Sequence, residues 1–208
     1  MRFLRTTKKH KEYWQKRDID WQKEYTATWN HPHRALLCEI LKTFEWKSLI
    51  EIGCGSGANL IRILKDFRGV QVGGIDINAA AIETAKKTFT GGVLKVGVGD
   101  DIMLSDNAAD VILTDRTLIY VSPRHIGDYI KEIRRIGRHR IILCEFYEPR
   151  WLRRIKLRWT SGYHAYDYPR LLHHYGFYDI ILYKIPPQLW PGDTYPSFII
   201  TGKIPQRK

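Results

Sequence analysis

Short apolar runs alternate with stretches of helical periodicity through most of the chain. Runs that lack polar alternation are typical of strands buried on both faces of a parallel sheet. Apolar residues spaced three and four apart are typical of helices that pack on such a sheet. On this basis we predict strands at 49–52, 70–77, 94–98, 110–114 and 140–145, and helices at 31–44, 58–64, 79–87, 122–137 and 167–176.

The C-terminal part of the chain departs from this alternation. The segments 177–184 and 197–203 both have the composition of strands, and Pro186 and Pro187 follow the first of them without a helical pattern. Two consecutive strands without a crossover helix pair antiparallel. We therefore predict an α/β fold, a three-layer α/β/α sandwich around a seven-stranded, mostly parallel sheet whose last strand is antiparallel.

A glycine-rich turn joins the first strand to the next helix. Gly53, Gly55 and Gly57 follow the strand. Glycine adopts backbone angles closed to other residues, and its missing Cβ lets a ligand approach the main chain. The helix beyond adds unpaired N–H groups and a partial positive charge. Read from Gly53 to Ala58, the turn matches the dinucleotide pattern GxGxxG/A, whereas from Glu51 it reads ExGxGxG, so the turn alone leaves two cofactor classes open.

Composition and cysteine usage are those of an ordinary globular protein. A chain of 208 residues with 44% apolar and 27% charged residues suffices for one domain with a sizeable core. Cys38, Cys54 and Cys144 are far apart and form no metal-binding pair, so we predict reduced thiols, no metal site and a cytoplasmic location. No apolar run reaches the roughly 18 residues of a membrane-spanning helix.

Acidic residues follow the next two predicted strands at the same edge of the sheet. Asp76 ends the second strand, 23 residues after Gly53, where a carboxylate accepts hydrogen bonds from ribose hydroxyls. That role suits NAD and S-adenosylmethionine alike. Asp100 and Asp101 follow the third strand, and a carboxylate at that edge is placed to hold an adenine amino group.

Glu51 with the three glycines, Asp76, Asp100 and the late antiparallel hairpin, in this order, resemble the motifs of class I S-adenosylmethionine-dependent methyltransferases. The resemblance covers residues 33–145 motif by motif and is closest to members that act on small molecules. It implies a Rossmann-like sheet of order 3-2-1-4-5-7-6, with S-adenosylmethionine as cofactor and S-adenosylhomocysteine as product. The cofactor-binding residues that it implies are Glu51, Gly53, Cys54, Gly55, Gly57, Asp76, Ile77, Asp100 and Asp101.

The fourth predicted strand leads into Thr114-Asp115-Arg116-Thr117, at the edge where a methyl acceptor is expected. Methyl transfer from a sulfonium requires mainly positioning and desolvation, and an oxygen acceptor also needs a general base. This stretch differs from Asn-Pro-Pro-Tyr, the motif associated with amino methylation of bases, which argues against that group. Asp115 is our first candidate for a base or substrate-orienting carboxylate, and Tyr120 and Glu145 are further catalytic candidates.

The net charge of +12 is concentrated in two segments outside the region of the glycine turn. Residues 1–34 carry nine Lys and Arg against four Asp and Glu, and residues 123–174 carry twelve against five. Such a field favours an anionic substrate, a nucleic acid or an anionic membrane surface, and it equally suits a merely solubilising surface.

We expect an N-terminal helical cap at 1–32 and a methyltransferase domain at 33–208 with a basic, aromatic insertion at about 148–166. In similar methyltransferases the first helices close over the cofactor, which implies that Arg34 pairs with the cofactor carboxylate. The residues expected to bind substrate are Trp29, His31, Tyr147, His164 and Tyr166.

The insertion is longer than a usual connection. On a helix, Trp151, Leu152, Ile155 and Trp159 form one stripe that arginines flank. A basic amphipathic helix of this kind serves as a lid, a membrane-surface contact or a nucleic-acid contact. The plainer alternative is a helix that packs its tryptophan side on the core.

The sequence thus predicts an enzyme, an S-adenosylmethionine-dependent methyltransferase that acts on a small polar, anionic metabolite such as a sugar or lipid-linked precursor. The main alternative is methylation of RNA or protein through the basic segments, in which case RNA binding would weaken steeply with salt. An NAD-type Rossmann enzyme and a non-catalytic cofactor-binding protein are further alternatives. The acceptor atom and the oligomeric state are left open.

Overall fold

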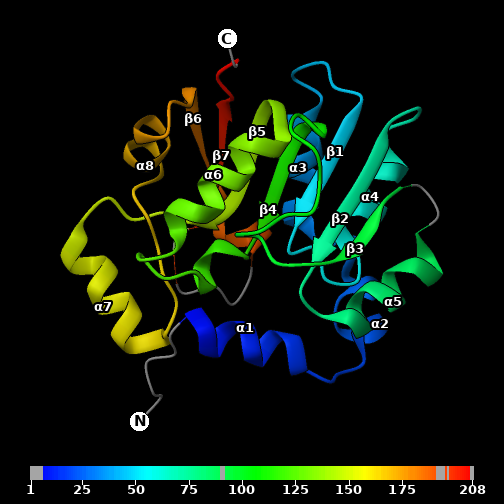
Figure 1. Ribbon diagram of the computed structural model, residues 1–208, viewed down its shortest axis with the longest axis horizontal. Helices are drawn as coiled ribbons and strands as arrows, with labels where there is room; N and C mark the ends of the chain where they lie inside the picture. The colour runs from blue at the N-terminus through cyan, green and yellow to red at the C-terminus, as the bar shows by residue number, and fades with distance from the viewer. Residues whose placement is uncertain (1–6, 90–91, 191–194, 196, 207–208) are drawn as a thin grey trace.

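The computed structural model describes the protein over residues 7–89, 92–190, 195 and 197–206. One twisted sheet carries helices on both faces (Figure 1). The strands are β1 (Ser48–Ile52), β2 (Gln71–Asp76), β3 (Leu94–Val96), β4 (Ala109–Asp115), β5 (Gly137–Phe146), β6 (Tyr178–Lys184) and β7 (Ser197–Lys203). The α-helices are α1 (Thr7–Lys16), α2 (Trp21–Glu24), α3 (Pro32–Leu41), α4 (Ala58–Asp66), α5 (Ala79–Thr88), α6 (Ile126–Ile136), α7 (Trp151–Ser161) and α8 (Tyr168–His174), and the short 3-10 helices are η1 (Thr26–Thr28), η2 (Leu118–Tyr120) and η3 (Pro187–Leu189).

The strand order is β3-β2-β1-β4-β5-β7-β6, which confirms the predicted topology. β1 lies centrally and pairs in parallel with both neighbours, so that Leu49 is opposite Val72 of β2 and Val111 of β4. β7 lies between β5 and β6 and is antiparallel to both. The late hairpin therefore forms one lateral edge of the sheet. The carboxyl ends of the parallel strands lie together along a different side, where these strands end.

One helix and one strand begin at residues that differ by three or more from the predicted ones. α6 begins at Ile126 rather than at Ser122, because the Ser122 carbonyl first accepts hydrogen bonds from His125 N and Ile126 N at 2.9 and 3.0 Å and forms a turn. β5 begins at Gly137, directly after α6, where a strand was predicted only from Arg140. A strand can follow a helix this closely because Gly137 has no side chain to clash with the packed Ile112 and Ile204.

Each face of the sheet has its own apolar core. α6 and α8 pack on one face, and α3, α4 and α5 pack on the other, which gives the predicted three layers. The first core includes Ile130, Ile133 and Leu172 against Ile112 and Ile141, and the second includes Leu37, Leu60 and Ile82 against Leu49 and Val111.

The N-terminal segment lies across the carboxyl ends of the parallel strands. Figure 1 shows α1 running beneath this edge, from beside α7 towards α2. Asn78, which caps α5, also donates through Nδ2 to the carbonyls of Trp14 and Arg17 at 2.8 Å. At the other end of α1, His10 Nδ1 lies 2.9 Å from the Tyr120 carbonyl. These contacts hold α1 over the region where ligands bind in open α/β sheets.

The insertion forms a helix, α7, but its tryptophan side does not pack on the core. Trp151, Leu152, Ile155 and Trp159 are all exposed, whereas Leu157 is buried. The plain alternative, a helix that buries its tryptophan stripe, is therefore wrong. The buried contact comes from the opposite face, because Leu157 is the residue of α7 that joins an apolar cluster.

The buried face of α6 provides a test of the core. Ile133 is fully buried in the apolar core that α6 forms with the sheet, so truncation to Ala leaves a cavity in addition to the lost burial. We expect Ile133→Ala to lower the free energy of unfolding by about 3 kcal/mol in urea denaturation. Lys131→Ala on the exposed side of the same helix serves as control and should change it by less than about 0.5 kcal/mol. Equal effects of the two substitutions would contradict the assigned orientation of α6.

Candidate active site

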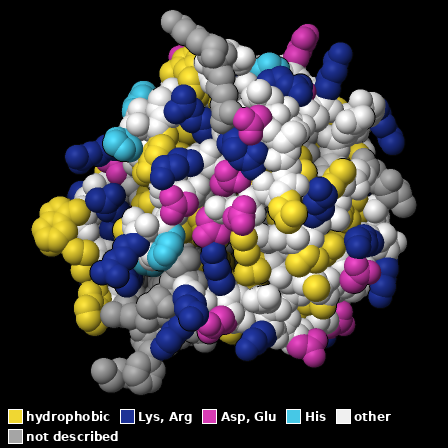
Figure 2. All heavy atoms as spheres, viewed as in Figure 1, with side chains coloured by type: hydrophobic (Ala, Val, Ile, Leu, Met, Phe, Trp, Pro, Cys, Tyr) yellow, Lys and Arg dark blue, Asp and Glu magenta, His cyan; other side chains and the backbone are white. Residues whose placement is uncertain are grey.

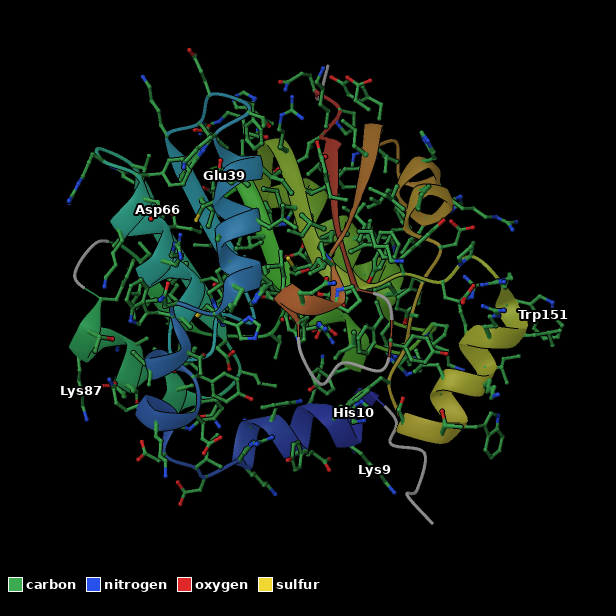
Figure 3. The ribbon with its side chains drawn as sticks, turned by 180° about the vertical axis from the view of Figure 1, so that it is seen from behind. Lys9, His10, Glu39, Asp66, Lys87 and Trp151 are labelled. Atoms are coloured by element: carbon green, nitrogen blue, oxygen red, sulfur yellow. The ribbon has the colours of Figure 1, made fainter. Side chains whose placement is uncertain are left out.

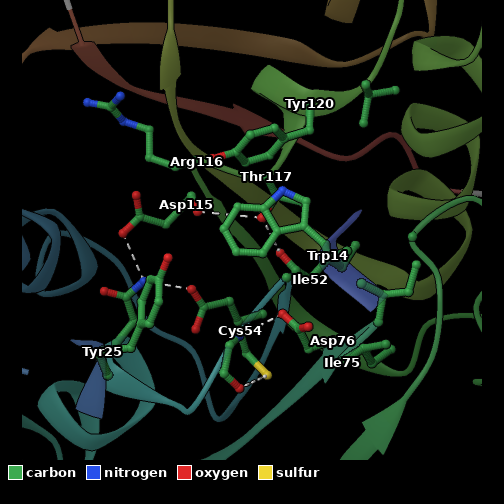
Figure 4. A pocket seen from close by; sticks show the side chains of 18 of the residues that line it. Trp14, Tyr25, Ile52, Cys54, Ile75, Asp76, Asp115, Arg116, Thr117 and Tyr120 are labelled. Carbon is green, nitrogen blue, oxygen red and sulfur yellow. Dashed lines mark hydrogen bonds between the residues drawn. The ribbon is translucent and has the colours of Figure 1, made fainter. Parts of the chain in front are cut away.

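A cavity of about 340 Å³ lies at the carboxyl ends of β1, β2 and β4. Figure 4 shows that its walls come from both the sheet edge, with Asp76 and Asp115, and the N-terminal segment, with Trp14 and Tyr25. From the strand ends it is lined by Glu51, Ile52, Gly53, Cys54, Gly55, Ile75, Asp76, Ile77, Asp115, Arg116 and Thr117, and from α1 to α3 by His10, Lys11, Trp14, Trp21, Tyr25, His31, His33 and Arg34.

The glycine turn forms the floor of this cavity. Gly53 and Gly55 have φ values of +77° and +53°, in the left-handed region that favours glycine. A side chain at Gly53 would collide with Thr117, whereas nothing lies within 4 Å of the place of a Cβ at Gly55. The backbone at Gly55 is therefore open to a ligand. Its N–H donates to Asp76 Oδ2 at 2.8 Å, which ties the turn to the end of β2.

Asp76 is held at the end of β2 by the backbone of its neighbours. Its Oδ1 accepts a hydrogen bond from Asn78 N at 2.8 Å, and its Oδ2 accepts the bond from Gly55. Burial raises the pKa of Asp76 above its usual range, against the opposing effect of these backbone donors. The carboxylate is thus fixed in position and lines the cavity.

Glu51 is a buried carboxyl without enough partners. Its side chain is 2% exposed, Oε1 accepts a hydrogen bond from Asn59 Nδ2 at 2.6 Å, and Oε2 has no partner among the described residues. Burial raises the pKa of Glu51 to about 8, the Asn59 amide opposes this, and the nearby Asp115 carboxylate adds to it. A positively charged group in the cavity would remove this cost.

Asp115 is the ionised partner of this carboxyl. Its Oδ2 lies 2.9 Å from Asn59 Nδ2 and 2.8 Å from His33 Nε2. Burial by itself raises the pKa of Asp115, but the His33 ring, Arg34 and the Asn59 amide more than offset it and hold the pKa well below its usual range. Because an ionised carboxylate only accepts hydrogen bonds, His33 Nε2 must be the donor.

A second histidine extends this pair. His31 Nδ1 lies 2.7 Å from His33 Nδ1. In a neutral His33 ring with its proton on Nε2, Nδ1 is an acceptor, so His31 donates from Nδ1 and keeps Nε2 as an acceptor nitrogen. Burial, followed by the neighbouring His33 and Arg34, lowers the pKa of His31 below 6.5, so this ring is neutral near pH 7. The chain His31–His33–Asp115 therefore ends in a basic nitrogen of a residue that lines the cavity.

Arg34 and Arg116 place two guanidinium groups beside these carboxylates. Arg34 is 8% exposed, donates to the Thr28 carbonyl at 2.8 Å and leaves Nε without a partner among the described residues. Arg116 is clamped between two aromatic rings, 4.2 Å from the centroid of Phe146 and 4.1 Å from that of Trp190. The cavity thus offers separate anionic and cationic walls.

The residues after β3 form the far end of the cavity. Gly97, Val98 and Gly99 line it, whereas Asp100 pairs with Lys11 of α1, with Nζ 2.7 Å from Oδ1. Asp101 is exposed and lies outside the lining. Lys11 itself lines the cavity, so Asp100 contributes to this end by fixing α1 over it.

Glu145, a catalytic candidate from the sequence, lies beneath the cavity wall instead of in its lining. Its Oε1 accepts hydrogen bonds from Thr114 Oγ1, Thr117 N and Leu118 N at 2.9 to 3.0 Å. Burial raises its pKa to about 7. The geometry is that of a carboxyl that holds the turn after β4 in place, and so positions Asp115.

The other predicted residues divide between the cavity and its surroundings. Tyr120 lines the cavity, and burial raises the pKa of its phenol above the usual range, so it stays neutral. The predicted residues that line the cavity are Arg34, His31, Glu51, Gly53, Cys54, Gly55, Asp76, Ile77, Asp115 and Tyr120. Those that the structure places outside the lining are Trp29, Gly57, Asp100, Asp101, Glu145, Tyr147, His164 and Tyr166.

Their actual contacts explain the second group. Trp29 has its ring beneath Lys65 Nζ at 3.3 Å, on the outer side of α4. Tyr147 packs edge-on against Phe198. Tyr166 is buried and donates its hydroxyl to the Val121 carbonyl. These tyrosine and tryptophan rings near the sheet edge therefore pack against other parts of the protein. Composition alone does not distinguish a ring that packs in this way from one that lines a pocket.

Several lining residues escaped the sequence interpretation. Asn59 lies in the first turn of α4, opposite Glu51, and only the strand–turn–helix geometry brings them together. Trp190 comes from the C-terminal loop and packs on the His33 ring at a centroid distance of 3.9 Å. For Trp190 the sequence contains no local signal, because its partner is remote along the chain.

Comparisons with known proteins agree with this geometry. The sequence model of the methyltransferase-domain family matches residues 49–139, which include the glycine turn, Asp76 and Asp115. Residues 49–139 therefore match a methyltransferase domain, and the strand order of the sheet is the one that the class I resemblance implies. The resemblance inferred from Glu51, the glycines, Asp76 and Asp100 is thereby confirmed, and the cofactor of this class is S-adenosylmethionine.

Known proteins similar to this methyltransferase domain differ in their substrates. The ribosomal RNA small subunit methyltransferase C of Buchnera aphidicola subsp. Baizongia pistaciae (strain Bp) is 34% identical over 61 residues, which are 29% of this chain and 19% of that protein. The ribosomal protein L11 methyltransferase of Dictyoglomus turgidum (strain DSM 6724 / Z-1310) is 32% identical over 100 residues, 42% of this chain and 33% of that protein. The chain thus spans a third or less of the length of these relatives.

A solved structure supports the fold over a larger share of the chain. A geranyl diphosphate methyltransferase in complex with S-adenosylmethionine superposes with a TM-score of 0.66 over 83% of this chain and 84% of that one, at 15% identity. At this identity the likeness concerns the fold. The superposition covers 83% of this chain, a larger share than residues 49–139, so it also includes elements that precede or follow this range.

The residues present fit S-adenosylmethionine at one end of the cavity in particular. Glu51 Oε2, Asn59 Oδ1, Asp115 Oδ1 and Arg34 Nε are buried polar atoms without partners among the described residues. The methionine part of the cofactor carries both an ammonium and a carboxylate, which complement these acceptors and this donor. Asp76 and the open backbone at Gly55 suit the ribose and the adjoining chain.

Two kinds of site do not occur in the part of the chain that the structure describes. No group of three His, Cys, Asp or Glu side chains there is arranged to hold a metal ion. Likewise, none of the described helices is long and apolar enough to cross a bilayer.

The buried Glu51 carboxyl predicts a pH-dependent effect of Glu51→Gln. Because the folded protein raises this pKa from 4.5 to about 8, the stability linked to the retained proton is complete below 4.5 and is lost as the pH rises through 8. The neutral Gln avoids that loss. We expect the variant without cofactor to gain melting temperature relative to wild type as the pH rises from about 4.5 to about 8, with a constant difference above that, and to be stabilised less by S-adenosylmethionine. A pH-independent difference in melting temperature would contradict the assigned protonation.

Proposed function

We propose that the protein transfers the methyl group of S-adenosylmethionine to a small polar, anionic molecule, such as a sugar or a lipid-linked precursor. The observation that carries the proposal is the partial enclosure of the cavity by α1, α3 and Trp190, which leaves about 340 Å³ at the sheet edge. This volume is at the lower end of the range for small-molecule pockets, about 300–1,000 Å³. A polymer segment would have to displace the N-terminal segment to reach the carboxyl ends of the strands.

The charge of the acceptor follows from the cationic wall. Arg116 is fixed by its two aromatic neighbours and by a hydrogen bond from Nη2 to Ser197 Oγ at 2.7 Å. The backbone of Arg116 has a φ of +54°, a conformation that residues other than glycine adopt only where the surrounding structure enforces it. A guanidinium fixed in this way beside the cavity binds a carboxylate or phosphate with little loss of conformational entropy.

The chain His31–His33–Asp115 supplies a base. Bound S-adenosylmethionine supplies an electrophilic methyl group on a sulfonium. His31 is neutral near pH 7 and would take up the proton that a hydroxyl acceptor loses on methylation, while the S–CH3 bond of the cofactor would break and S-adenosylhomocysteine would leave. His33 and the ionised Asp115 stabilise the positive charge that His31 gains, through the hydrogen bonds at 2.7 and 2.8 Å. Asp115 thus acts as an orienting carboxylate rather than as the proton acceptor.

Methylation of RNA or protein is the second candidate. The observations that favour it are the charge of +12 and the two curated relatives, which are named as ribosomal RNA and ribosomal protein methyltransferases. It ranks lower because its acceptor must enter a cavity that α1 covers, and because Arg116 and His31 belong to the lining of that cavity.

Transfer of labelled methyl groups separates the two candidates. The protein would be incubated with methyl-tritiated S-adenosylmethionine and, separately, with the metabolite fraction, the total RNA and the protein fraction of its host. We expect label to accumulate in the metabolite fraction and to bind an anion exchanger. Label in RNA or protein, with none in the metabolites, would overturn the small-molecule assignment.

Asp76 provides the test of the cofactor assignment. Loss of its carboxylate removes charged hydrogen bonds to the ribose, so we expect Asp76→Ala to weaken S-adenosylhomocysteine binding about 30-fold in calorimetry. Glu83→Ala on the exposed side of α5 is the control and should bind as the wild type does. If neither cofactor form binds the wild type, or if Asp76→Ala binds equally well, the assignment is wrong.

His31 provides the test of the base. We expect His31→Gln to lower kcat about 10²- to 10⁴-fold on the labelled metabolite fraction while the affinity for S-adenosylhomocysteine changes little. The lowered pKa places the acid limb of the wild-type rate profile below pH 6.5. His125→Gln, at the start of α6 and outside the cavity lining, is the matched control. A kcat equal to that of the control variant would exclude His31 as the base.

A further inference from the structure

α7 presents an apolar stripe to solvent. Trp151, Leu152, Ile155 and Trp159 are 61%, 63%, 43% and 67% exposed. Their spacing of one, three and four residues places them on one side of the helix. In Figure 3 the labelled Trp151 lies at the outer end of α7 and points away from the body of the protein. Four large apolar side chains in one exposed row indicate an interaction surface.

The helix is held by its opposite side. Leu157 is 2% exposed and packs in a cluster with Ile119, Phe146 and Ala165. Successive residues of an α-helix are about 100° apart, so Leu157 faces the direction opposite to the middle of the stripe. The apolar face is therefore turned outward by the packing of α7 itself.

Basic residues surround the stripe. Arg153, Arg154, Lys156 and Arg158 belong to α7, Arg150 precedes it, and α7 contains no acidic residue. Figure 2 shows apolar side chains protruding at the left edge, over α7, with Lys and Arg side chains beside them. Glu148 is the nearby acidic group, and it already pairs with Arg150 at 3.0 Å. The surface thus combines an apolar row with a positive rim.

We propose that α7 docks on the surface of an anionic lipid bilayer, with its axis in the plane of the interface. Trp side chains favour the boundary between head groups and acyl chains, and Leu152 and Ile155 enter the acyl region between them. The arginines and the lysine then lie at the level of the anionic head groups. This docking does not depend on the proposed methyl transfer, because lipid binding requires only α7.

The composition of the surface argues against two other occupants. A second copy of the chain would bring the same positive rims together, and stable interfaces bury about 800 Å² per partner, more than one 11-residue helix offers. An RNA strand would use the arginines and stack bases on the tryptophans, but Leu152 and Ile155 in the middle of the stripe have no π face for stacking.

The anchoring of α7 places the bilayer next to the cavity. Tyr163, just after α7, contacts the Tyr120 ring edge-on at a centroid distance of 5.6 Å, and Tyr120 lines the cavity. The next residue, His164, donates its N–H to the Ile119 carbonyl at 2.8 Å. A docked α7 therefore brings the wall that carries Tyr120 close to the lipid surface.

Vesicle flotation tests the proposal with the full chain. Vesicles of phosphatidylcholine with about 30% phosphatidylglycerol are compared with vesicles of phosphatidylcholine alone. We expect the wild type to bind the anionic vesicles at least about tenfold more tightly, and Trp151→Ala/Trp159→Ala to lose at least about tenfold of that binding. Arg154→Glu/Lys156→Glu should remove the preference for anionic lipid.

The controls separate docking from folding and from other occupants. Val96→Ala/Met103→Ala removes two exposed apolar side chains far from α7 and should bind vesicles as the wild type does. Brominated lipids should quench wild-type tryptophan fluorescence more than that of the Trp151→Ala/Trp159→Ala variant. The proposal is overturned if the folded wild type does not bind anionic vesicles, if light scattering shows a dimer that the double variant abolishes, or if the double variant loses RNA binding and binds vesicles as the wild type does.

Discussion

The site depends on two carboxyl groups that share one amide. Glu51 at the end of β1 and Asp115 at the end of β4 both accept hydrogen bonds from Asn59 Nδ2, at 2.6 and 2.9 Å. Two carboxylates buried at this range repel each other and have lost their hydration. The protein responds in two ways: Asp115 stays ionised beside His33 and Arg34, and Glu51 retains its proton until about pH 8. The cavity therefore favours a ligand that brings its own positive charge.

The N-terminal segment supplies what the sheet edge lacks. The carboxyl ends of β1, β2 and β4 carry acidic groups, and Lys11, His33 and Arg34 come from α1 and α3. Asn78 and Asp100 hold α1 in place, through the Trp14 and Arg17 carbonyls and through Lys11. Hydrogen bonds and ion pairs between these two groups of side chains thus both complete the site and cover it, which is why the cavity is small.

The exposed stripe of α7 is an exception to the burial of most large apolar side chains. Most large apolar side chains are divided between the cores on the two faces of the sheet, whereas the stripe of α7 is turned outward by the anchor at Leu157. Exposing two tryptophans costs solvation free energy in water. The apolar stripe and the positively charged residues beside it together complement a surface that is negatively charged and has an apolar interior beneath.

The sequence alone determined the layers, the strand order and the cofactor class. Buried parallel strands have short, uniformly apolar patterns, so the layers can be predicted from spacing. The glycine turn with Asp76 leaves two cofactor classes open, and the strand order and the cofactor followed from the family resemblance that Glu51, Asp100 and the late hairpin add. The tertiary structure decided which side chains meet. Asn59 reaches Glu51 and Asp115, Trp190 packs on His33, and Glu145 turns beneath the loop after β4, because these contacts join segments remote along the chain. It also decided that the stripe of α7 faces outward, since helical spacing defines a face but not its direction.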